Sequence, residues 1–402
     1  MSEVTAAIGD KKRRGAIGLL MAMTLLGVFP IDVLLPSFPA LSEHFRTEPA
    51  DIALSISLFA IGIALSQILI GPLSDIIGRK ELLLAGMAVS TLGALGCALS
   101  TEYFYFLLFR LVQALGCGCF MLSQALVQDL FEGEQRDRLR ILMVTAGGIF
   151  ISISPLAGTF LQGMMDWQGS FLVFAILAGA VFIKACFFLE SSRAMTSGPH
   201  PNIIQSYRRV CSNFSFMAYW LISAFAFACH FSFIVISPLI FMEQLQLSAY
   251  EFSLTLLVYG AAYIGGGIVA TILSRRINSA TQINTGLSLI LLSGLVMLYL
   301  SNRFGLSVLT VLVPMIICTT GTTIARPAAT SCAMNLFPDS AGTSVSAGST
   351  LIFIVGGLIS VLINLTSNGL QTTLGLCFIL LSGTGLALNA LSQRRQQGLI
   401  AD

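Results

Sequence analysis

Four ionisable side chains other than tyrosine and cysteine fall inside long apolar stretches of this 402-residue sequence: Asp32, Arg110, Lys184 and His230. An ionised group in hydrocarbon costs at least ~2.5–3.5 kcal/mol, so each of these side chains needs a function or a polar partner. Lys184 lies near the end of its stretch, from which a long side chain can extend its ammonium group to the membrane surface. Asp32 and His230 can exchange protons, whereas Arg110 stays charged. The residues therefore predict proton exchange inside a membrane.

Asp32 is the first candidate for the proton carrier, with Arg110 and His230 completing a predicted proton-coupling site. Asp32 and Arg110 fall at similar depth in their stretches, so we expect an ion pair or a near pair between them. Burial favours the neutral acid and a nearby guanidinium favours the carboxylate, so hydration or substrate can switch such a group. Two alternatives stay open: Arg110 as a purely structural anchor, and His230 as a neutral histidine hydrogen-bonded across helices.

A polar stripe follows Arg110 along one predicted helix. Its residues recur at intervals of three and four and so share one helix face: Arg110, Gln113, Cys117, Met121, Gln124 and Gln128. Lipid does not tolerate such a face, so we expect Gln113, Met121 and Gln124 to line a substrate cavity. The alternative is that these polar groups join helices by hydrogen bonds, with no solvent path between them.

The composition shows which elements must position these side chains. Apolar residues make up 55% of the chain and charged residues only 10%, far below the ~25% charge of soluble proteins. Hydropathy predicts twelve membrane spans at roughly 15–40, 52–72, 82–99, 104–128, 141–163, 169–189, 215–238, 252–273, 282–300, 305–325, 345–365 and 371–391. The predicted fold class is an all-α polytopic membrane protein.

The longest polar stretch inside the chain, 191–213, is predicted to be a cytoplasmic linker between two six-helix halves, 1–190 and 214–402. Such halves are typical of transporters built from parallel repeats. An even number of spans places both termini on one side. The basic residues outside the spans lie almost entirely on that side, Arg326 among them, with only Arg46 and Arg303 opposite. The positive-inside rule therefore predicts that both termini are cytoplasmic.

Several function classes are excluded by what the sequence lacks. None of the nine cysteines forms a C-x-x-C pair, so no zinc or redox site is expected. No lysine follows the glycine pattern of a phosphate-binding loop, so we do not expect ATP hydrolysis. The basic residues form no stripe suited to nucleic acid. We expect no enzymatic activity, no metal and no cofactor, and any uphill transport must draw on an ion gradient.

The segment GPLSDIIGRK joins the second and third predicted spans. It contains Gly71, Asp75, Gly78, Arg79 and Lys80. The two glycines allow close helix approach and a tight turn, and Asp75 lies at a helix end near basic residues with which it can pair. We expect this segment to control conformational change rather than to bind cargo.

The fourth and fifth predicted spans carry two further motifs. The fourth contains R-x-x-Q-x-x-G, from Arg110 to Gly116, and the fifth contains Ser154, Pro155 and Gly158 within GGIFISISPLAGTF. Together with the segment at 71–80, these motifs resemble the signatures of the major facilitator superfamily. Ser154, Pro155 and Gly158 resemble the motif of its twelve-span drug:proton antiporter branch, with Ser154 in place of the usual glycine. The exits of the first and seventh spans, IDVLLPSFP and SPLI, resemble the bicyclomycin- and chloramphenicol-resistance subfamily.

The resemblance implies a proton-coupled exporter of a small amphipathic compound or drug, working by alternating access in a bacterial inner membrane. It places Asp32 and Arg110 on helices that line the central cavity, and Ser154, Pro155 and Gly158 at a hinge between the two halves. The expected partners are the lipid bilayer, the cargo and protons, without nucleic acid or ATP, and we expect a monomer. One alternative is a dedicated exporter of an endogenous metabolite such as a siderophore. Another is a membrane scaffold or sensor that transports nothing.

Overall fold

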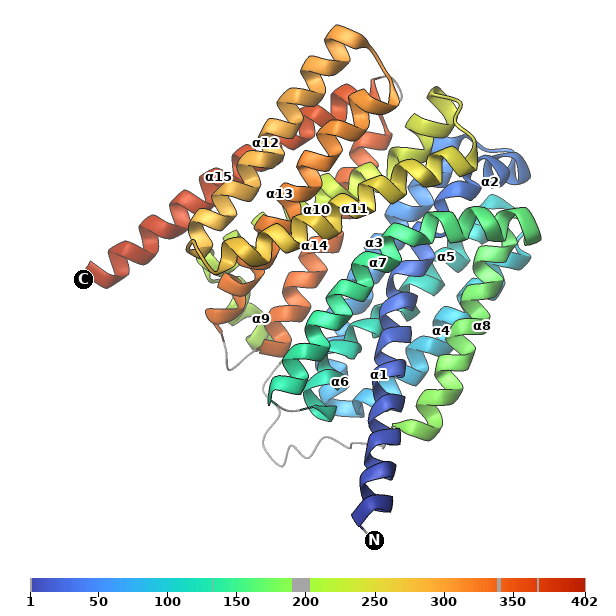
Figure 1. Cartoon of the computed structure of the whole chain (residues 1–402), viewed down its shortest axis with the longest axis vertical. Coiled ribbons are helices and arrows are strands. Elements are labelled where there is room, and N and C mark those ends of the chain that lie inside the picture. The colour runs from blue at the N-terminus through green and yellow to red at the C-terminus, as the bar shows by residue number, and fades with distance from the viewer. Residues whose placement is uncertain (1, 132, 190–202, 338–340, 367–368, 402) are drawn as a thin grey trace.

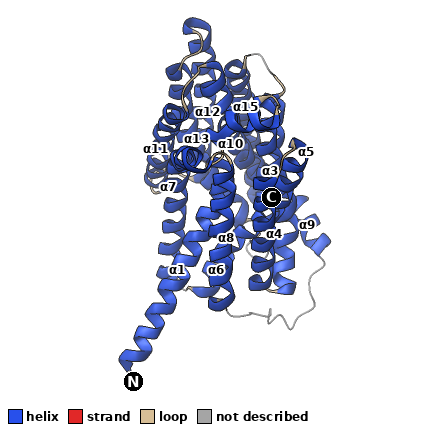
Figure 2. Cartoon of the chain, turned by 90° about the vertical axis from the view of Figure 1, so that its right-hand side faces the viewer, coloured by secondary structure: helices blue, strands red, loops and turns tan. Residues whose placement is uncertain are grey.

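The computed structural model describes residues 2–131, 133–189, 203–337, 341–366 and 369–401. Within these ranges every regular element is helical (Figure 2). Twelve helical segments are long and apolar enough to cross a membrane, which confirms the predicted all-α polytopic fold class. The positions of the segments agree with the hydropathy prediction except at the end of the tenth, because a span depends mainly on length and composition.

The first half contains six spanning segments. They are α1 (Ser2–Asp32) with η1 (Leu35–Ser37) and α2 (Phe38–Phe45), α3 (Pro49–Ile77), α4 (Arg79–Leu99), α5 (Tyr103–Cys117) with η2 (Gly118–Met121) and α6 (Leu122–Leu130), α7 (Gly133–Met165), and α8 (Gln168–Phe188). After α9 (Ile203–Cys211), the second half contains α10 (Phe214–Pro238) with η3 (Leu239–Gln244), α11 (Ala249–Ser274), α12 (Ser279–Phe304), α13 (Val308–Asn335), α14 (Ala341–Asn364) and α15 (Leu370–Ala401).

The two halves form separate helix bundles that lie side by side (Figure 1). We call the end of the molecule at which α1 begins and α9 lies the terminal side, and the end with α2 and the turn at Gly305 the distal side. The prediction that the terminal side faces the cytoplasm stays a prediction, as do the boundaries of the linker. The structure describes only the α9 part of that linker and the few residues that follow it.

Helices α3 and α14 join the two halves along most of their length. The Asn364 amide donates to the carbonyl oxygen of Ala50 at 2.6 Å near the distal side, and the hydroxyls of Ser57 and Ser360 are 2.7 Å apart. Near the terminal side, the hydroxyl of Ser346 donates to the Gln67 carbonyl oxygen at 2.5 Å. In an apolar membrane such hydrogen bonds hold neighbouring helices together.

Helices α7 and α11 form the second contact between the halves, in their distal and middle parts. The hydroxyls of Thr159 and Ser253 are 2.7 Å apart, and Ser253 also donates to the carbonyl oxygen of Pro155 at 3.1 Å. Toward the terminal side these two helices diverge (Figure 1). There the halves are joined by α3 and α14 rather than by α7 and α11.

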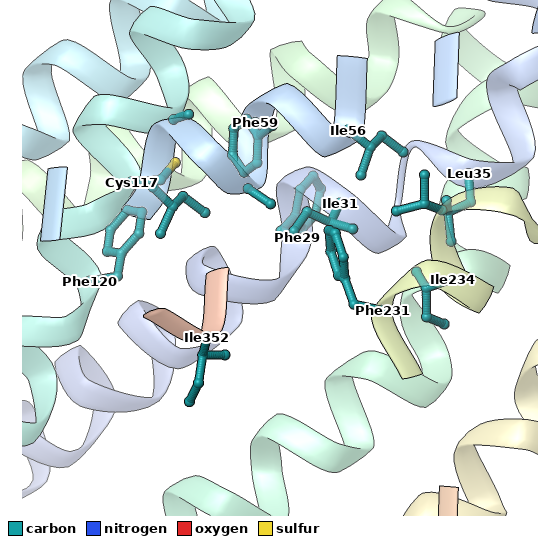
Figure 3. Packing of buried hydrophobic residues seen from close by; sticks show 14 of the residues in the cluster. Phe29, Ile31, Leu35, Ile56, Phe59, Cys117, Phe120, Phe231, Ile234 and Ile352 are labelled. Carbon is teal, nitrogen blue, oxygen red and sulfur yellow. The ribbon is translucent and has the colours of Figure 1, made fainter. Parts of the chain in front are cut away.

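Buried apolar residues of both halves meet at the centre of the molecule. Phe231 and Ile234 of α10 lie beside Ile31 and Leu35 of the first half, and all four are buried (Figure 3). Close-packed contacts of this kind resist small displacements, so a change of conformation requires the halves to move as bodies.

The tenth spanning helix departs from the prediction. Hydropathy ends it at residue 325, so Arg326 was expected to lie among the cytoplasmic charges that flank the spans. Helix α13 instead continues to Asn335, with Pro327 inside it, and Arg326 lies within the spanning helix. The boundary predicted at residue 325 therefore falls inside helix α13, so Arg326 is part of that helix and not of a flanking loop.

Gly158 provides a test of the packing between α7 and the end of α1. A Cβ added at Gly158 would lie 2.1 Å from the carbonyl oxygen of Val33, whereas a Cβ at Gly163 of the same helix would meet nothing within 4 Å. We expect Gly158→Ala to destabilise the protein by about 1–3 kcal/mol, because the backbone must shift to admit a methyl group. Thermal unfolding in detergent checks this, with Gly163→Ala as the matched control. Equal melting temperatures for the two variants would contradict the close approach.

Candidate functional site

Asp32 is the last residue of α1, at the point where the helix gives way to the turn η1. Its side chain is only 7% exposed, and it is the one buried carboxylate in the described part of the chain. It lies within electrostatic range of Tyr259 on α11, so it faces the second half. The surroundings of the Asp32 carboxyl group therefore depend on how the two halves pack against each other.

Arg110 is 1% exposed and is held by groups of its own half. Its Nη1 donates to the Gln113 side-chain oxygen at 2.8 Å, and its Nη2 donates to the carbonyl oxygen of Pro30 at 3.0 Å. The guanidinium also lies 4.2 Å from the ring centroid of Phe59, a favourable cation–π distance. These contacts tie α5 to the end of α1 that carries Asp32.

The end of α1 explains why a carbonyl oxygen is free for Arg110. The last carbonyl groups of a helix lack partners in the helix itself. Here the amide of Leu34 bonds to the Ile31 carbonyl instead of that of Pro30. The expected ion pair between Asp32 and Arg110 is not formed in this conformation: within the described ranges no ion pair joins them, and both terminal nitrogens of the guanidinium are occupied elsewhere. Similar depth in two helices does not fix the directions in which their side chains point.

His230 is 6% exposed and belongs to a group of aromatic side chains in the second half. Its Nδ1 is hydrogen-bonded to the hydroxyl of Tyr259, and its ring lies nearly parallel to that of Tyr259, with centroids 5.5 Å apart. The ring of Tyr263 is also 5.5 Å away. His230 of α10 is thus hydrogen-bonded to a residue of α11. Its partner, Tyr259, is the same residue that lies within electrostatic range of Asp32.

A cavity of about 240 Å³ lies mainly in the first half. Its wall includes polar groups of Thr24, Gln67 and Ser123 among apolar side chains, with Phe353 of α14 contributed by the second half. Met121, at the end of η2, lines this cavity. Gln113 does not, because it is fully buried against Arg110. The side chain of Gln124 lies outside the described residues.

The segment between α3 and α4 contains the tight turn that its glycines predict. Gly78 has a φ of 110°, a conformation that favours glycine. Lys80 donates from Nζ to the carbonyl oxygens of Cys186 at 2.9 Å and Leu189 at 2.5 Å, so it caps the end of α8. Gly71 accepts a hydrogen bond from Ser74 through its carbonyl oxygen. Arg79 begins α4, and the side chain of Asp75 lies outside the described residues.

The residues of the predicted hinge between the halves fall into two groups. Pro155 lies at the contact with the second half, because its carbonyl oxygen accepts from Ser253. Ser154 is buried. Gly158 instead packs against Val33 of its own half, so it makes room for α1 rather than for α11.

Arg326 is the functional candidate that the sequence analysis missed. Its guanidinium lies 4.9 Å from the ring centroid of Phe227, and its Nε is buried without a hydrogen-bond partner. The sequence did contain a signal for its position. Alanines and threonines continue on both sides of Arg326, so the helix could be expected to extend beyond residue 325.

Twelve candidate spans in two six-helix halves, with a cavity of mixed polar and apolar lining, are typical of membrane transporters. The family model described as Major Facilitator Superfamily matches residues 16–361. The chain therefore belongs to the major facilitator superfamily. It is a transporter and not an enzyme, as the sequence predicts.

Three relatives illustrate the similarity. An uncharacterized MFS-type transporter of Bacillus subtilis, YdgK, is 26% identical over 64% of this chain and 66% of its own length. Multidrug resistance protein D of Escherichia coli is 25% identical over 92% of this chain and 94% of its own length. The multidrug transporter MdfA of Yersinia pestis is 29% identical over 58% of each chain. The first alignment spans just under two thirds of its relative, the third spans little more than half, and the second spans nearly all of its relative.

Proposed function

We propose that this chain is a proton-coupled antiporter that exports a small amphipathic compound across a bacterial inner membrane, with Asp32 as the proton carrier. The observation that carries the proposal is the burial of Asp32 at the junction of the halves, with no hydrogen bond or ion pair to its carboxyl group in the described part of the chain. A buried carboxylate without a fixed partner is costly as a charge, so it can bind a proton in one conformation and release it in another.

Three further observations support this proposal. Relatives named as multidrug transporters are similar to most of the chain. The cavity has a mixed polar and apolar lining, which suits an amphipathic cargo. Helices α7 and α11 diverge toward the terminal side (Figure 1), so with cytoplasmic termini the wider end between these two helices would face the inside of the cell. We also propose that the chain belongs to the bicyclomycin- and chloramphenicol-resistance subfamily.

Efflux from cells tests the proposal. Cells that overproduce the chain are loaded with a panel of anionic, neutral and cationic amphipathic compounds, and the loss of each compound is followed with and without a protonophore. We expect faster efflux of at least one compound, abolished by the protonophore. Efflux that survives collapse of the proton gradient would contradict proton coupling.

A substitution at His230 distinguishes a second proton site from a neutral histidine that only joins two helices. Because its Nδ1 is hydrogen-bonded to Tyr259, we propose that it stays neutral and holds α10 against α11. We expect His230→Gln to lower the thermal stability by about 1 kcal/mol, the worth of an ordinary hydrogen bond, while pH-driven transport stays within about threefold of the unsubstituted protein. A complete loss of pH-driven transport in a folded variant would make His230 a second proton site.

A further inference from the structure

Arg326 is a cation inside the second half that the proton mechanism does not use. It lies in α13, facing α10 through Phe227 and within electrostatic range of His230 and Tyr263. Its Nε is buried without a partner, and no acceptor within the described ranges bonds to its guanidinium. Arg326 as a whole is half-buried, so its terminal nitrogens are accessible to a ligand, while a buried donor such as its Nε is normally satisfied in native proteins.

The comparison with Arg110 shows where the two halves differ: the Nε of both arginines is buried without a partner, but among the described residues only Arg110 has acceptors at its terminal nitrogens. In the first half, Gln113 and the Pro30 carbonyl oxygen both accept from Arg110. In the second half, no acidic side chain is buried among the described residues. The ring of Phe227 stabilises the charge of Arg326 only in part, since a cation–π contact leaves the N–H groups without acceptors.

Aromatic side chains connect Arg326 to the cavity. The ring of Phe227 is 5.3 Å from that of Phe353, which belongs to the cavity wall. Phe227 also stacks on Phe231, with centroids 5.2 Å apart. The cavity and the guanidinium thus lie at the two ends of a continuous apolar surface. A ligand with an apolar body against Phe353 and Phe227 would place a polar group at Arg326.

The buried charges favour an anion over a cation. Among the described residues, the carboxyl group of Asp32 and the guanidinium of Arg110 are buried, and Arg326 is half-buried with its Nε inside. When Asp32 carries a proton, both remaining charges are positive. A cationic ligand would be repelled at close range in this low-dielectric interior, whereas a carboxylate can accept two hydrogen bonds from one guanidinium.

We propose that Arg326 binds the acidic group of the cargo, and that the cargo is an amphipathic anion whose apolar body packs on Phe227 and Phe353. This inference rests on the proposed function, because it names the chemical class of the exported compound. It also assigns a role to each half: the first half carries the proton on Asp32, and the second half selects the cargo through its charge.

Equilibrium binding to the purified full chain in detergent tests the inference with three matched probes: naphthoate, methyl naphthoate and naphthylmethylammonium. The probes share an aromatic body and differ in charge. We expect naphthoate to bind about tenfold or more tightly than the other two, since a charge-assisted hydrogen bond is worth about 1.5–3 kcal/mol. Arg326→Gln should remove this preference and leave the binding of methyl naphthoate unchanged.

Two control variants keep the test decisive. Arg326→Lys retains a positive charge and should retain part of the preference for naphthoate, even if the bidentate geometry is lost. Arg303→Gln removes an exposed arginine at the end of α12 and should change nothing. Equal binding of the three probes, tighter binding of the cation, or an equal loss for all probes in Arg326→Gln would overturn the inference. Binding is measured without a pH gradient, so these outcomes do not depend on whether Asp32 couples transport to protons.

Discussion

We expect the replacement of Asp32 with asparagine to abolish pH-driven accumulation of cargo and to leave the protein folded in the membrane. The amide has nearly the shape of the carboxyl group but cannot exchange a proton, and Asp32 is the one buried carboxylate in the described ranges. For one proton per cargo molecule, a gradient of one pH unit supplies about 1.4 kcal/mol, enough for about tenfold accumulation. In Asp32→Asn this accumulation should fall to the equilibrium level.

The measurement is uptake into proteoliposomes with an imposed pH gradient, using a compound identified by the efflux assay. Glu43→Gln is the matched control, because Glu43 is an exposed acid on α2. Its accumulation should equal that of the unsubstituted protein. Undiminished uphill transport by Asp32→Asn would remove Asp32 from the mechanism.

The second large effect is expected from Arg110→Gln. This change removes the hydrogen bond to the Pro30 carbonyl oxygen and the cation–π contact with Phe59. We expect a loss of about 2–4 kcal/mol in the free energy of unfolding, because the buried acceptors are left unsatisfied. Exchange should fall about tenfold or more, because the end of α1 that carries Asp32 is no longer fixed.

A double-mutant cycle separates positioning of Asp32 from general destabilisation. Arg110 acts on Asp32 through the backbone of α1, so Arg110→Gln should lower exchange little further once Asp32 is already Asn. Arg303→Gln, at an exposed position, is the control for loss of a positive charge. Strictly additive losses in the double variant would show that Arg110 serves packing or cargo binding independently of Asp32.

The spans and their buried charges could be predicted from the sequence, for a physical reason. Spans depend on length and hydropathy, which are local properties, and the burial of Asp32, Arg110 and His230 follows from their place in apolar stretches. The tight turn at Gly78 was predicted for a similar reason, since a positive φ is available to glycine at little cost.

The partners of these residues could not be predicted. The contact of Arg110 with the Pro30 carbonyl depends on how α1 ends and how α5 is rotated about its axis, and neither is encoded in depth along a helix. Gly158 was assigned to the hinge, although α7 presents it to Val33 in its own half. Arg326 was placed outside the membrane because hydropathy ended α13 too early. Each error arises where tertiary packing, rather than local sequence, decides the outcome.

The most direct test of the central claim is transport by the purified protein in proteoliposomes, with an imposed pH gradient as the only energy source. With the compartment that corresponds to the cytoplasm kept more alkaline, a compound identified by the efflux assay should move out of that compartment against its own gradient. The movement should stop when an ionophore collapses the pH gradient. Transport that only equilibrates the compound, at the same rate with and without the gradient, would contradict proton-coupled export.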